Sequence, residues 1–324
     1  MVNINANLFQ QKNPVYFGLS KDRRPVVIAN HKSGATKDQE SKFLSKFKKS
    51  ITTLREKIIN GFSSSANMPE VIIAPSSPFY DMYERSLKDV PEFALGGQNC
   101  IWDGEDPYSH VQWPLTGELT IGQLKSCGVK YIFVGHIERK DFQVEDTLQT
   151  IHKVSSILTS EEKNIFPIIC LREKFEHKNN RAEAYKDISL QLSNYLMKVR
   201  KKEDFKKLSK SIIAYEPFWP TEQKAEKLPC DPKTVNNAAK AIRESIYEEA
   251  IVREFTPKEA REIANKIRIT YGAFVTDKNI DNYLTDDCAE LDGLLVGRPG
   301  LNNEIFAPML SKTAVKWNEI LQSK

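Results

Sequence analysis

Short apolar runs alternate with helical segments along almost the whole chain, and this alternation limits the possible folds most strongly. The runs are four to six residues long and do not alternate between apolar and polar side chains, as half-exposed strands would. Continuous apolar strands are typical of a parallel sheet that is buried on both faces. We expect strands at residues 25–30, 71–74, 93–96, 131–134, 166–170, 211–215, 267–270 and 292–296.

A segment with apolar residues at helical spacing follows each expected strand. Asp231-Pro232 is a good N-cap and first-turn pair, and Thr256-Pro257 begins a capping box for a short extra helix. Eight such βα units in one chain favour a closed (β/α)8 barrel over a doubly wound sheet. We therefore expect an α/β protein with an N-terminal extension (1–24) and one barrel domain (25–324). The expected helices cover residues 37–60, 79–88, 120–127, 145–158, 181–199, 232–251, about 280–284 and 304–321.

Charge and cysteine content exclude several classes of protein. The 47 basic and 43 acidic residues leave a net charge of only +4, which does not favour nucleic-acid binding. Five cysteines lie far apart without a C-x-x-C pair, which argues against zinc and disulfides and favours a reducing compartment. There is no apolar run long enough for a transmembrane span and no signal-peptide core. We expect a cytoplasmic protein without membrane partners, and import into an organelle stays open.

Three of the expected strand ends carry side chains suited to chemistry. Asn30 and Lys32 follow the first strand, His136 follows the fourth, and Glu216 follows the sixth. Catalytic residues of such barrels lie at the carboxyl ends of the strands. A carboxylate at the mouth of a buried strand is costly to desolvate, which favours a functional interpretation of Glu216. The alternative is a solvated glutamate that opens a loop before Pro217.

These strand ends resemble the triosephosphate isomerase family. Asn30-His31-Lys32 resembles its N-x-K motif, G-H-I-E-R from Gly135 resembles its G-H-S-E-R, and A-Y-E-P-F-W from Ala214 resembles its A-Y-E-P-x-W. The resemblance implies an isomerase without cofactor or metal that moves a proton through an enediolate. It assigns Glu216 as base, His136 as electrophile, Lys32 as positive charge and Asn30 as its support. It also implies that Glu138 pairs with Lys32 and that Arg139 forms a structural ion pair.

The loops that would hold the substrate phosphate depart from the family pattern. After Trp219 the chain reads P-T-E-Q-K-A-E-K, with Glu222 where the family has a glycine. Phe274 replaces a serine after the seventh strand, and Gly297-Arg298 replaces a glycine pair after the eighth. We expect Phe274, Gly297 and Arg298 to contact the phosphate, with the Arg298 guanidinium as a new grip.

These departures leave the substrate open. The Gly297-Arg298 pair resembles the branch of the family that isomerises four-carbon ketose phosphates, so the sugar phosphate has either three or four carbons. A barrel that has lost its phosphate grip and serves a binding or structural role is the alternative of another class. The loop from Gln98 to Thr116 is longer than in the family and contains three large aromatic residues. Since aromatic side chains in long exposed loops favour interfaces, we expect a homodimer formed through this loop.

Overall fold

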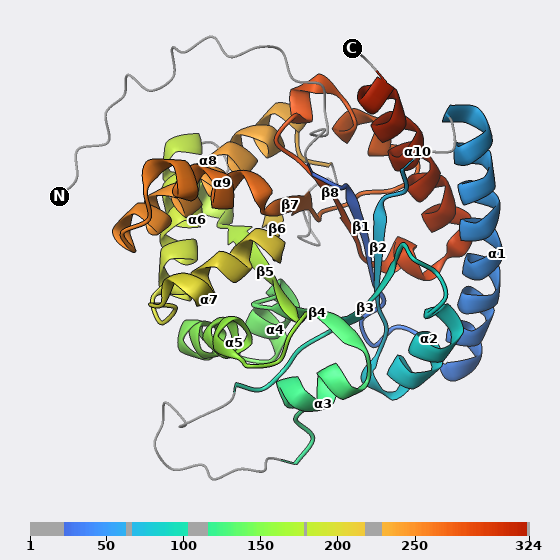
Figure 1. The fold of residues 1–324 in the computed structure, drawn as a ribbon, viewed down its shortest axis with the longest axis horizontal. Helices are drawn as coiled ribbons and strands as arrows, with labels where there is room; N and C mark the ends of the chain where they lie inside the picture. Colours follow the sequence, from blue (N-terminus) through green and yellow to red (C-terminus); the bar gives the residue numbers. More distant parts are fainter. Residues whose placement is uncertain (1–22, 63–66, 103–115, 178–179, 218–228, 323–324) are drawn as a thin grey trace.

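The computed structural model describes residues 23–62, 67–102, 116–177, 180–217 and 229–322, and Figure 1 shows its fold. Eight parallel strands form one closed barrel in chain order, which confirms the predicted single (β/α)8 barrel. The strands are β1 (Val26–Asn30), β2 (Glu70–Ala74), β3 (Phe93–Gly97), β4 (Val129–Val134), β5 (Phe166–Glu173), β6 (Ile212–Pro217), β7 (Arg268–Tyr271) and β8 (Gly293–Val296).

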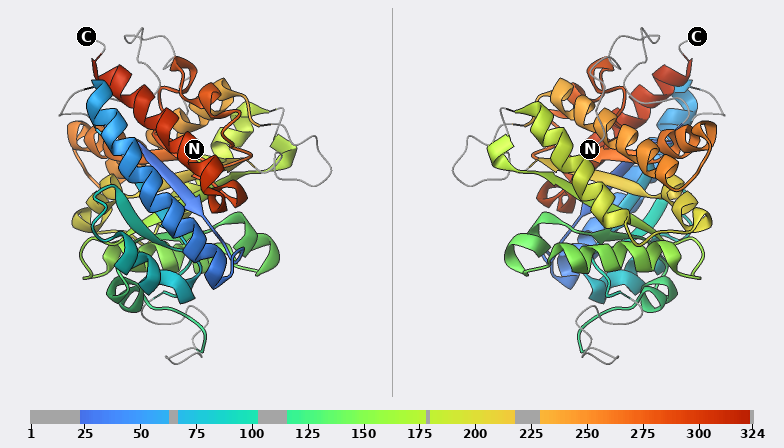
Figure 2. Two further views of the ribbon diagram at one scale, coloured as in Figure 1. Left: turned by 90° about the vertical axis from the view of Figure 1, so that its right-hand side faces the viewer. Right: turned by 90° about the vertical axis from the view of Figure 1, so that its left-hand side faces the viewer.

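Helices surround this barrel, and α1 and α10 lie side by side on its outer surface (Figure 2). The helices are α1 (Lys37–Phe62), α2 (Tyr80–Leu87), α3 (Ile121–Ser126), α4 (Ile137–Phe142), α5 (Thr147–Thr159), α6 (Arg181–Leu196), α7 (Lys202–Lys206), α8 (Pro232–Val252), α9 (Pro257–Lys266) and α10 (Asn303–Gln322). Short 3-10 turns complete the pattern, namely η2 (Ser77–Phe79), η3 (Phe175–His177), η4 (Lys207–Lys210), η6 (Ile280–Tyr283), η7 (Asp286–Cys288) and η8 (Arg298–Leu301).

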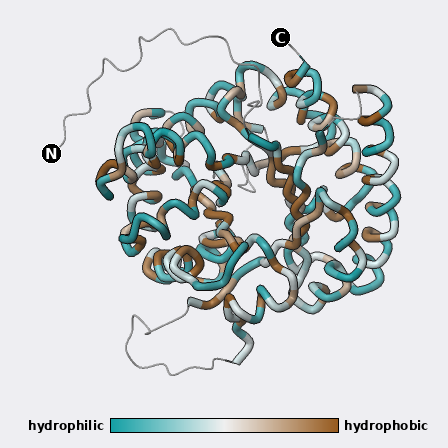
Figure 3. Tube along the Cα trace, viewed as in Figure 1, coloured by the Kyte–Doolittle hydropathy of each residue, from teal (hydrophilic) through white to brown (hydrophobic). Residues whose placement is uncertain are grey.

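The strands are buried on both faces, as their apolar sequences predict. Val26 and Ile28 of β1 belong to a cluster of buried side chains inside the barrel. Val27 and Ala29 of the same strand belong to the larger core between the barrel and the helices. Because side chains alternate along a strand, one apolar run supplies both layers. Figure 3 shows hydrophobic strands at the centre, surrounded by helices in which hydrophilic and hydrophobic residues alternate.

β5 and β6 extend furthest past the carboxyl ends that the sequence indicates. β5 runs to Glu173, and β6 continues past Tyr215 because Arg172 pairs with Glu216 and Glu173 pairs with Pro217. Glu216 therefore lies within β6 instead of following it. Pro217 is the last residue of the strand, and its missing N–H prevents the ladder from continuing.

Among the described residues, no helix combines the length and apolar character that crossing a membrane requires. The expected extension lies almost wholly in residues 1–22, outside the described residues. Its last two residues, Arg23 and Arg24, contact the barrel: Arg23 is paired with Asp292, and the Arg24 Nε donates to the Met68 carbonyl at 2.9 Å.

Candidate active site

Glu216 is a buried carboxylate at the carboxyl end of the barrel. Glu216 is 4% exposed, and its Oε2 atom has no hydrogen-bond partner among the described residues. Burial raises the pKa of the Glu216 carboxyl, and attraction to His136 and Lys32 and a hydrogen bond from the Ile137 N–H oppose this rise. A carboxyl with a raised pKa and a free oxygen can accept a proton from a bound molecule.

His136 faces Glu216 from the end of β4, with 3.6 Å between its Nε2 and the Glu216 Oε1. The residue is the N-cap of α4, and its Nδ1 accepts a hydrogen bond from the Glu138 N–H at 3.2 Å. Because Nδ1 is an acceptor, the proton of a neutral ring lies on Nε2. The imidazole thus presents an N–H donor to the space beside Glu216. Phe133 packs edge-to-face on the ring, with centroids 6.1 Å apart.

Lys32 lies in a left-handed backbone conformation, with φ of 55°. The Asn30 side chain stabilises this conformation because its Oδ1 accepts a hydrogen bond from the Lys32 N–H at 3.0 Å. Ser76 and Gln98 both donate to the Lys32 carbonyl, at 2.7 and 2.6 Å. The Lys32 ammonium is 2.5 Å from the Glu138 Oε1, and both side chains are partly exposed. Three side chains therefore fix the Lys32 backbone, and Glu138 holds its amine.

Arg139, within α4, belongs to an ion-pair network. Its Nε donates to Glu145 at 2.5 Å and one terminal nitrogen donates to Gln143 at 2.7 Å. The buried Lys153 ammonium also contacts Glu145 at 2.7 Å and reaches the Asn99 side chain at 2.9 Å. This network ties the loop after β4 to α5 and to the start of the loop after β3.

The three expected phosphate contacts lie on loops after the neighbouring strands β7 and β8. Phe274 has a left-handed backbone (φ 50°), and its carbonyl accepts from the Asn279 side chain at 2.7 Å. A Cβ at Gly297 would lie 3.9 Å from the Lys32 Cε, so the end of β8 lies beside the lysine. Arg298 is exposed at the start of η8.

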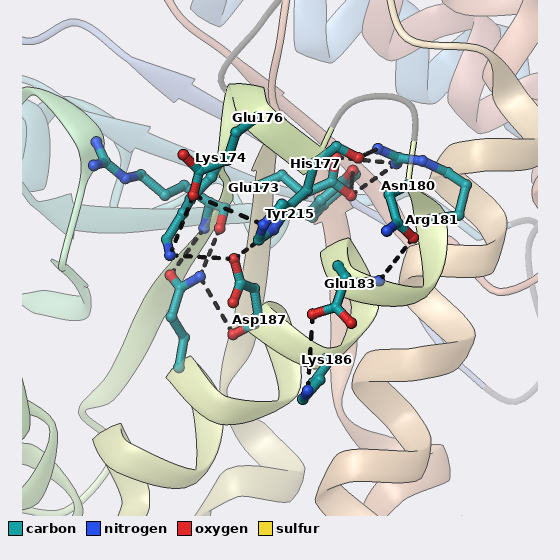
Figure 4. A network of polar contacts seen from close by, with 12 residues as sticks. Glu173, Lys174, Glu176, His177, Asn180, Arg181, Glu183, Lys186, Asp187 and Tyr215 are labelled. Carbon is teal, nitrogen blue, oxygen red and sulfur yellow. Dashed lines mark hydrogen bonds and ion pairs between the residues drawn. The ribbon is translucent and has the colours of Figure 1, made fainter.

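A polar network on the outer side of β6 has no counterpart among the residues singled out from the sequence (Figure 4). Tyr215 donates its hydroxyl to the fully buried Glu173 at 2.8 Å. Arg181 of α6 donates to both oxygens of that carboxylate, at 2.9 and 3.0 Å. Burial raises the pKa of Glu173 despite the Tyr215 and Arg181 hydrogen bonds. The alternation of β6 provided a signal, because Tyr215 must point away from the side on which Glu216 lies.

Some expected features fall outside the described residues. These are Trp219, the lid with Glu222, and residues 103–115 of the long third loop. Within the described part of the chain, no three His, Cys, Asp or Glu side chains are grouped so that they could hold a metal ion.

Comparison with known proteins gives one consistent result. A family model described as "Triosephosphate isomerase" matches residues 25–313. The chain is 29% identical over 286 residues to the triosephosphate isomerase of Dictyoglomus turgidum, covering 88% of this chain and 97% of the relative. It is 28% identical over 292 residues to the protein of that name from Baumannia cicadellinicola, covering 90% and 98%. The Caldanaerobacter subterraneus protein is 28% identical over 291 residues, with 89% and 99% covered.

Proposed function

Because the chain belongs to the triosephosphate isomerase family and is therefore an aldose–ketose isomerase, we propose that it interconverts glyceraldehyde 3-phosphate and dihydroxyacetone phosphate. A place in glycolysis follows from the family. The observation that carries the proposal is the pairing of a buried, raised-pKa carboxyl at Glu216 with the Nε2–H of His136, 3.6 Å away.

Glu216 is the proposed base. Moving a carbonyl between adjacent carbons requires one group that removes a proton from the first carbon and returns it to the second. The raised pKa suits both steps, because a stronger base removes the proton more readily and its conjugate acid still returns it. The Oε2, which has no hydrogen-bond partner among the described residues, is the oxygen proposed to make this transfer.

His136 and Lys32 are the proposed stabilisers of the intermediate. The Nε2–H of a neutral His136 donates to the carbonyl oxygen as negative charge develops there. The Lys32 ammonium supplies positive charge for the enediolate, and Asn30 maintains the backbone turn that places it. Glu138 orients the ammonium, while Arg139 braces the loop through Glu145.

The proposed phosphate site comprises the loops after β7 and β8, with Phe274, Gly297 and Arg298. Arg298 makes no hydrogen bond or ion pair with another described residue, and its exposed guanidinium suits a phosphate dianion. The same residue favours a second candidate function, isomerisation of a four-carbon ketose phosphate of the erythrulose phosphate type. A longer substrate places its phosphate further from the catalytic pair, where an arginine reaches further than a glycine amide.

A coupled assay with both substrates tests the proposal and its alternative. We expect turnover of the three-carbon substrate that falls strongly in Lys32→Ala, and a larger kcat/KM for that substrate than for the four-carbon one. The reverse ratio would select the second candidate. If neither substrate turns over and a hydroxamate mimic of the enediolate fails to bind, the chain is a barrel with a binding or structural role.

We also propose a homodimer on the side of the barrel that carries the third loop. Phe142 and Val144 are 80% and 84% exposed, and Val144 adopts a left-handed backbone (φ 57°). The third loop begins on the same side, because Asn99 bonds to Lys153 and the Trp102 ring lies 6.1 Å from that of His152. Large apolar side chains exposed together favour an interface.

A further inference from the structure

His31 stands in the middle of the Asn30-His31-Lys32 turn, yet no step of the proposed reaction uses it. Its residue is 1% exposed. Strand alternation directs it out of the barrel, because Val27 and Ala29 of the same parity pack in the outer core. The side chain therefore lies behind the turn that carries Lys32, under helices α1 and α2.

A buried hydrogen-bonded triad surrounds this imidazole. The His31 Nδ1 is 2.8 Å from the Oε2 of Glu40, a fully buried residue in the first turn of α1. The hydroxyl of Tyr83 in α2 donates to the same oxygen. Burial and the nearby Glu40 raise the pKa of Tyr83, so its hydroxyl keeps the proton that it donates. With Glu40 as the acceptor of both bonds, the ring proton of His31 is on Nδ1.

Within the described part of the chain, the triad leaves two buried polar atoms without hydrogen bonds, which is energetically unfavourable. The His31 Nε2 and the Glu40 Oε1 have no hydrogen-bond partner among the described residues. The imidazole packs edge-to-face on Phe43, with centroids 4.7 Å apart, in an otherwise apolar surrounding. Apolar residues of similar size at all three positions would fill this space without leaving polar atoms unpartnered. A polar group kept at such a site favours a role beyond packing.

We propose that His31 is a positioning residue for Lys32, and that Glu40 and Tyr83 act through it. The left-handed backbone of Lys32 persists only where its surroundings enforce it. Asn30, Ser76 and Gln98 hold the Lys32 peptide groups directly. His31 fixes the position just before Lys32. Its own N–H donates to the Ala74 carbonyl at 3.0 Å, and its ring is bound to Glu40 of α1, which Tyr83 of α2 also contacts.

Through the triad, helices α1 and α2 are connected to the turn that positions the Lys32 amine. The Glu40–His31 bond fixes the turn relative to α1, and the Tyr83–Glu40 bond fixes α1 relative to α2. If the ring lost its anchor, the turn could rotate about the residue before Lys32. The ammonium would then leave Glu138, because that contact of 2.5 Å depends on the backbone conformation.

The test separates hydrogen bonding from packing with two variants. His31→Phe keeps an aromatic ring without an N–H, whereas His31→Asn keeps an N–H near the Nδ1 position and loses the ring. The readout is competitive acetylation of lysines in the whole chain, measured by mass spectrometry and needing no substrate. Lys32 is compared with Lys266, whose side chain is 62% exposed on α9.

We expect His31→Phe to raise Lys32 acetylation at least about threefold, because a partly exposed ion pair is easily lost. Tyr83→Phe, which removes one hydroxyl and keeps the ring, should raise it less, and His31→Asn should stay closer to the parent. A matched control is Asn318→Ala, which removes a buried polar group of α10 that bonds to Asn67. It should leave the ratio unchanged. A parental ratio in His31→Phe, or an equal rise in His31→Asn, would overturn the proposal.

The effect on catalysis rests on the proposed function and is measured separately. We expect kcat/KM of His31→Phe to fall about tenfold, because small displacements of a positioned group are costly. In a Lys32→Ala background, His31→Phe should not weaken binding of the hydroxamate mimic further, and a further loss would contradict an effect through Lys32. If acetylation responds but even the parent chain isomerises neither substrate, the proposed function fails and the positioning role stands.

Discussion

Glu216 combines two opposed requirements in one side chain. As the proposed base, the carboxylate must be ionised to remove a proton, yet it is buried where charge is disfavoured. Its neighbours offset this burial only in part, so the pKa stays raised. The rate of proton transfer should then depend more on where the carboxylate lies than on its being a carboxylate. A displaced carboxylate can no longer reach both carbons of the substrate.

Shortening the Glu216 side chain should therefore reduce turnover strongly. We expect Glu216→Asp to reduce kcat by about 100-fold or more, since a 1 Å misplacement of a catalytic group is enough for such a loss. The measurement is steady-state turnover in the coupled assay. Glu244→Asp is the control, because the Glu244 side chain is 57% exposed and pairs with Arg261. A Glu216→Asp enzyme with more than about a third of parental kcat would contradict the role of base.

The elements show why part of the structure was predictable. Eight apolar runs predicted all eight strands, and the strand ends predicted where Lys32, His136 and Glu216 would gather. The lengths of β5 and β6 were not predictable, because pairing of Arg172 with Glu216 decides them and neither residue favours a strand. Helix α4 was missed because its six residues show no apolar period, and the His136 N-cap begins it.

The network around Glu173 could not be predicted from the pattern of apolar residues either. Three separate segments supply it, β5, β6 and α6, and only the fold brings them together. It lies directly behind the strand that carries Glu216, so its integrity bears on the position of the proposed base. The same reasoning explains why His31, Glu40 and Tyr83 could not be grouped from the sequence.

Removing Arg181 tests this element-level support. We expect Arg181→Ala to lower the free energy of unfolding by about 1.5–3 kcal/mol, as for a lost hydrogen bond to a charged group. Urea denaturation measures the change. Lys186→Ala on the same helix is the matched control: its 3.8 Å pair with Glu183 is exposed, so we expect a loss of at most about 0.5 kcal/mol. Equal losses in the two variants would show that Glu173 does not depend on Arg181.

At the scale of the whole barrel, the end opposite the site is closed by charges. Glu70 contacts Arg268 and Lys130, each at 2.6 Å, and accepts from Tyr131 at 3.0 Å. Burial disfavours the Glu70 carboxylate most strongly, but attraction to Arg268 and Lys130 and hydrogen bonds from both together outweigh it and lower the pKa to about 2. This pairing joins β2, β4 and β7 across the barrel interior.

The lowered pKa makes stability depend on pH in one direction. A carboxyl with a folded-state pKa below its ordinary 4.5 stabilises the fold above that value. The contribution is lost as the pH falls from about 4.5 toward about 2. We expect the free energy of unfolding to decline across this window, and Glu70→Gln to flatten the decline and lower stability at pH 7. Urea titrations at several pH values measure both, and parallel curves for the two proteins would contradict the assignment.

Assembly is the last property that the whole molecule must satisfy. A single barrel leaves Phe142 and Val144 exposed beside the anchored start of the third loop. The ion pairs of Glu145 with the partly exposed Arg139 and the buried Lys153 hold that region in place. A rigid apolar surface suits self-association, because little conformational entropy is lost on binding.

We expect a dimer by analytical ultracentrifugation at micromolar concentration, and a monomer for Val144→Asp. The control is Val252→Asp at the end of α8, where a side chain 76% exposed lies away from this loop. A monomeric parent chain, or equal dissociation of both variants, would exclude an interface at Val144.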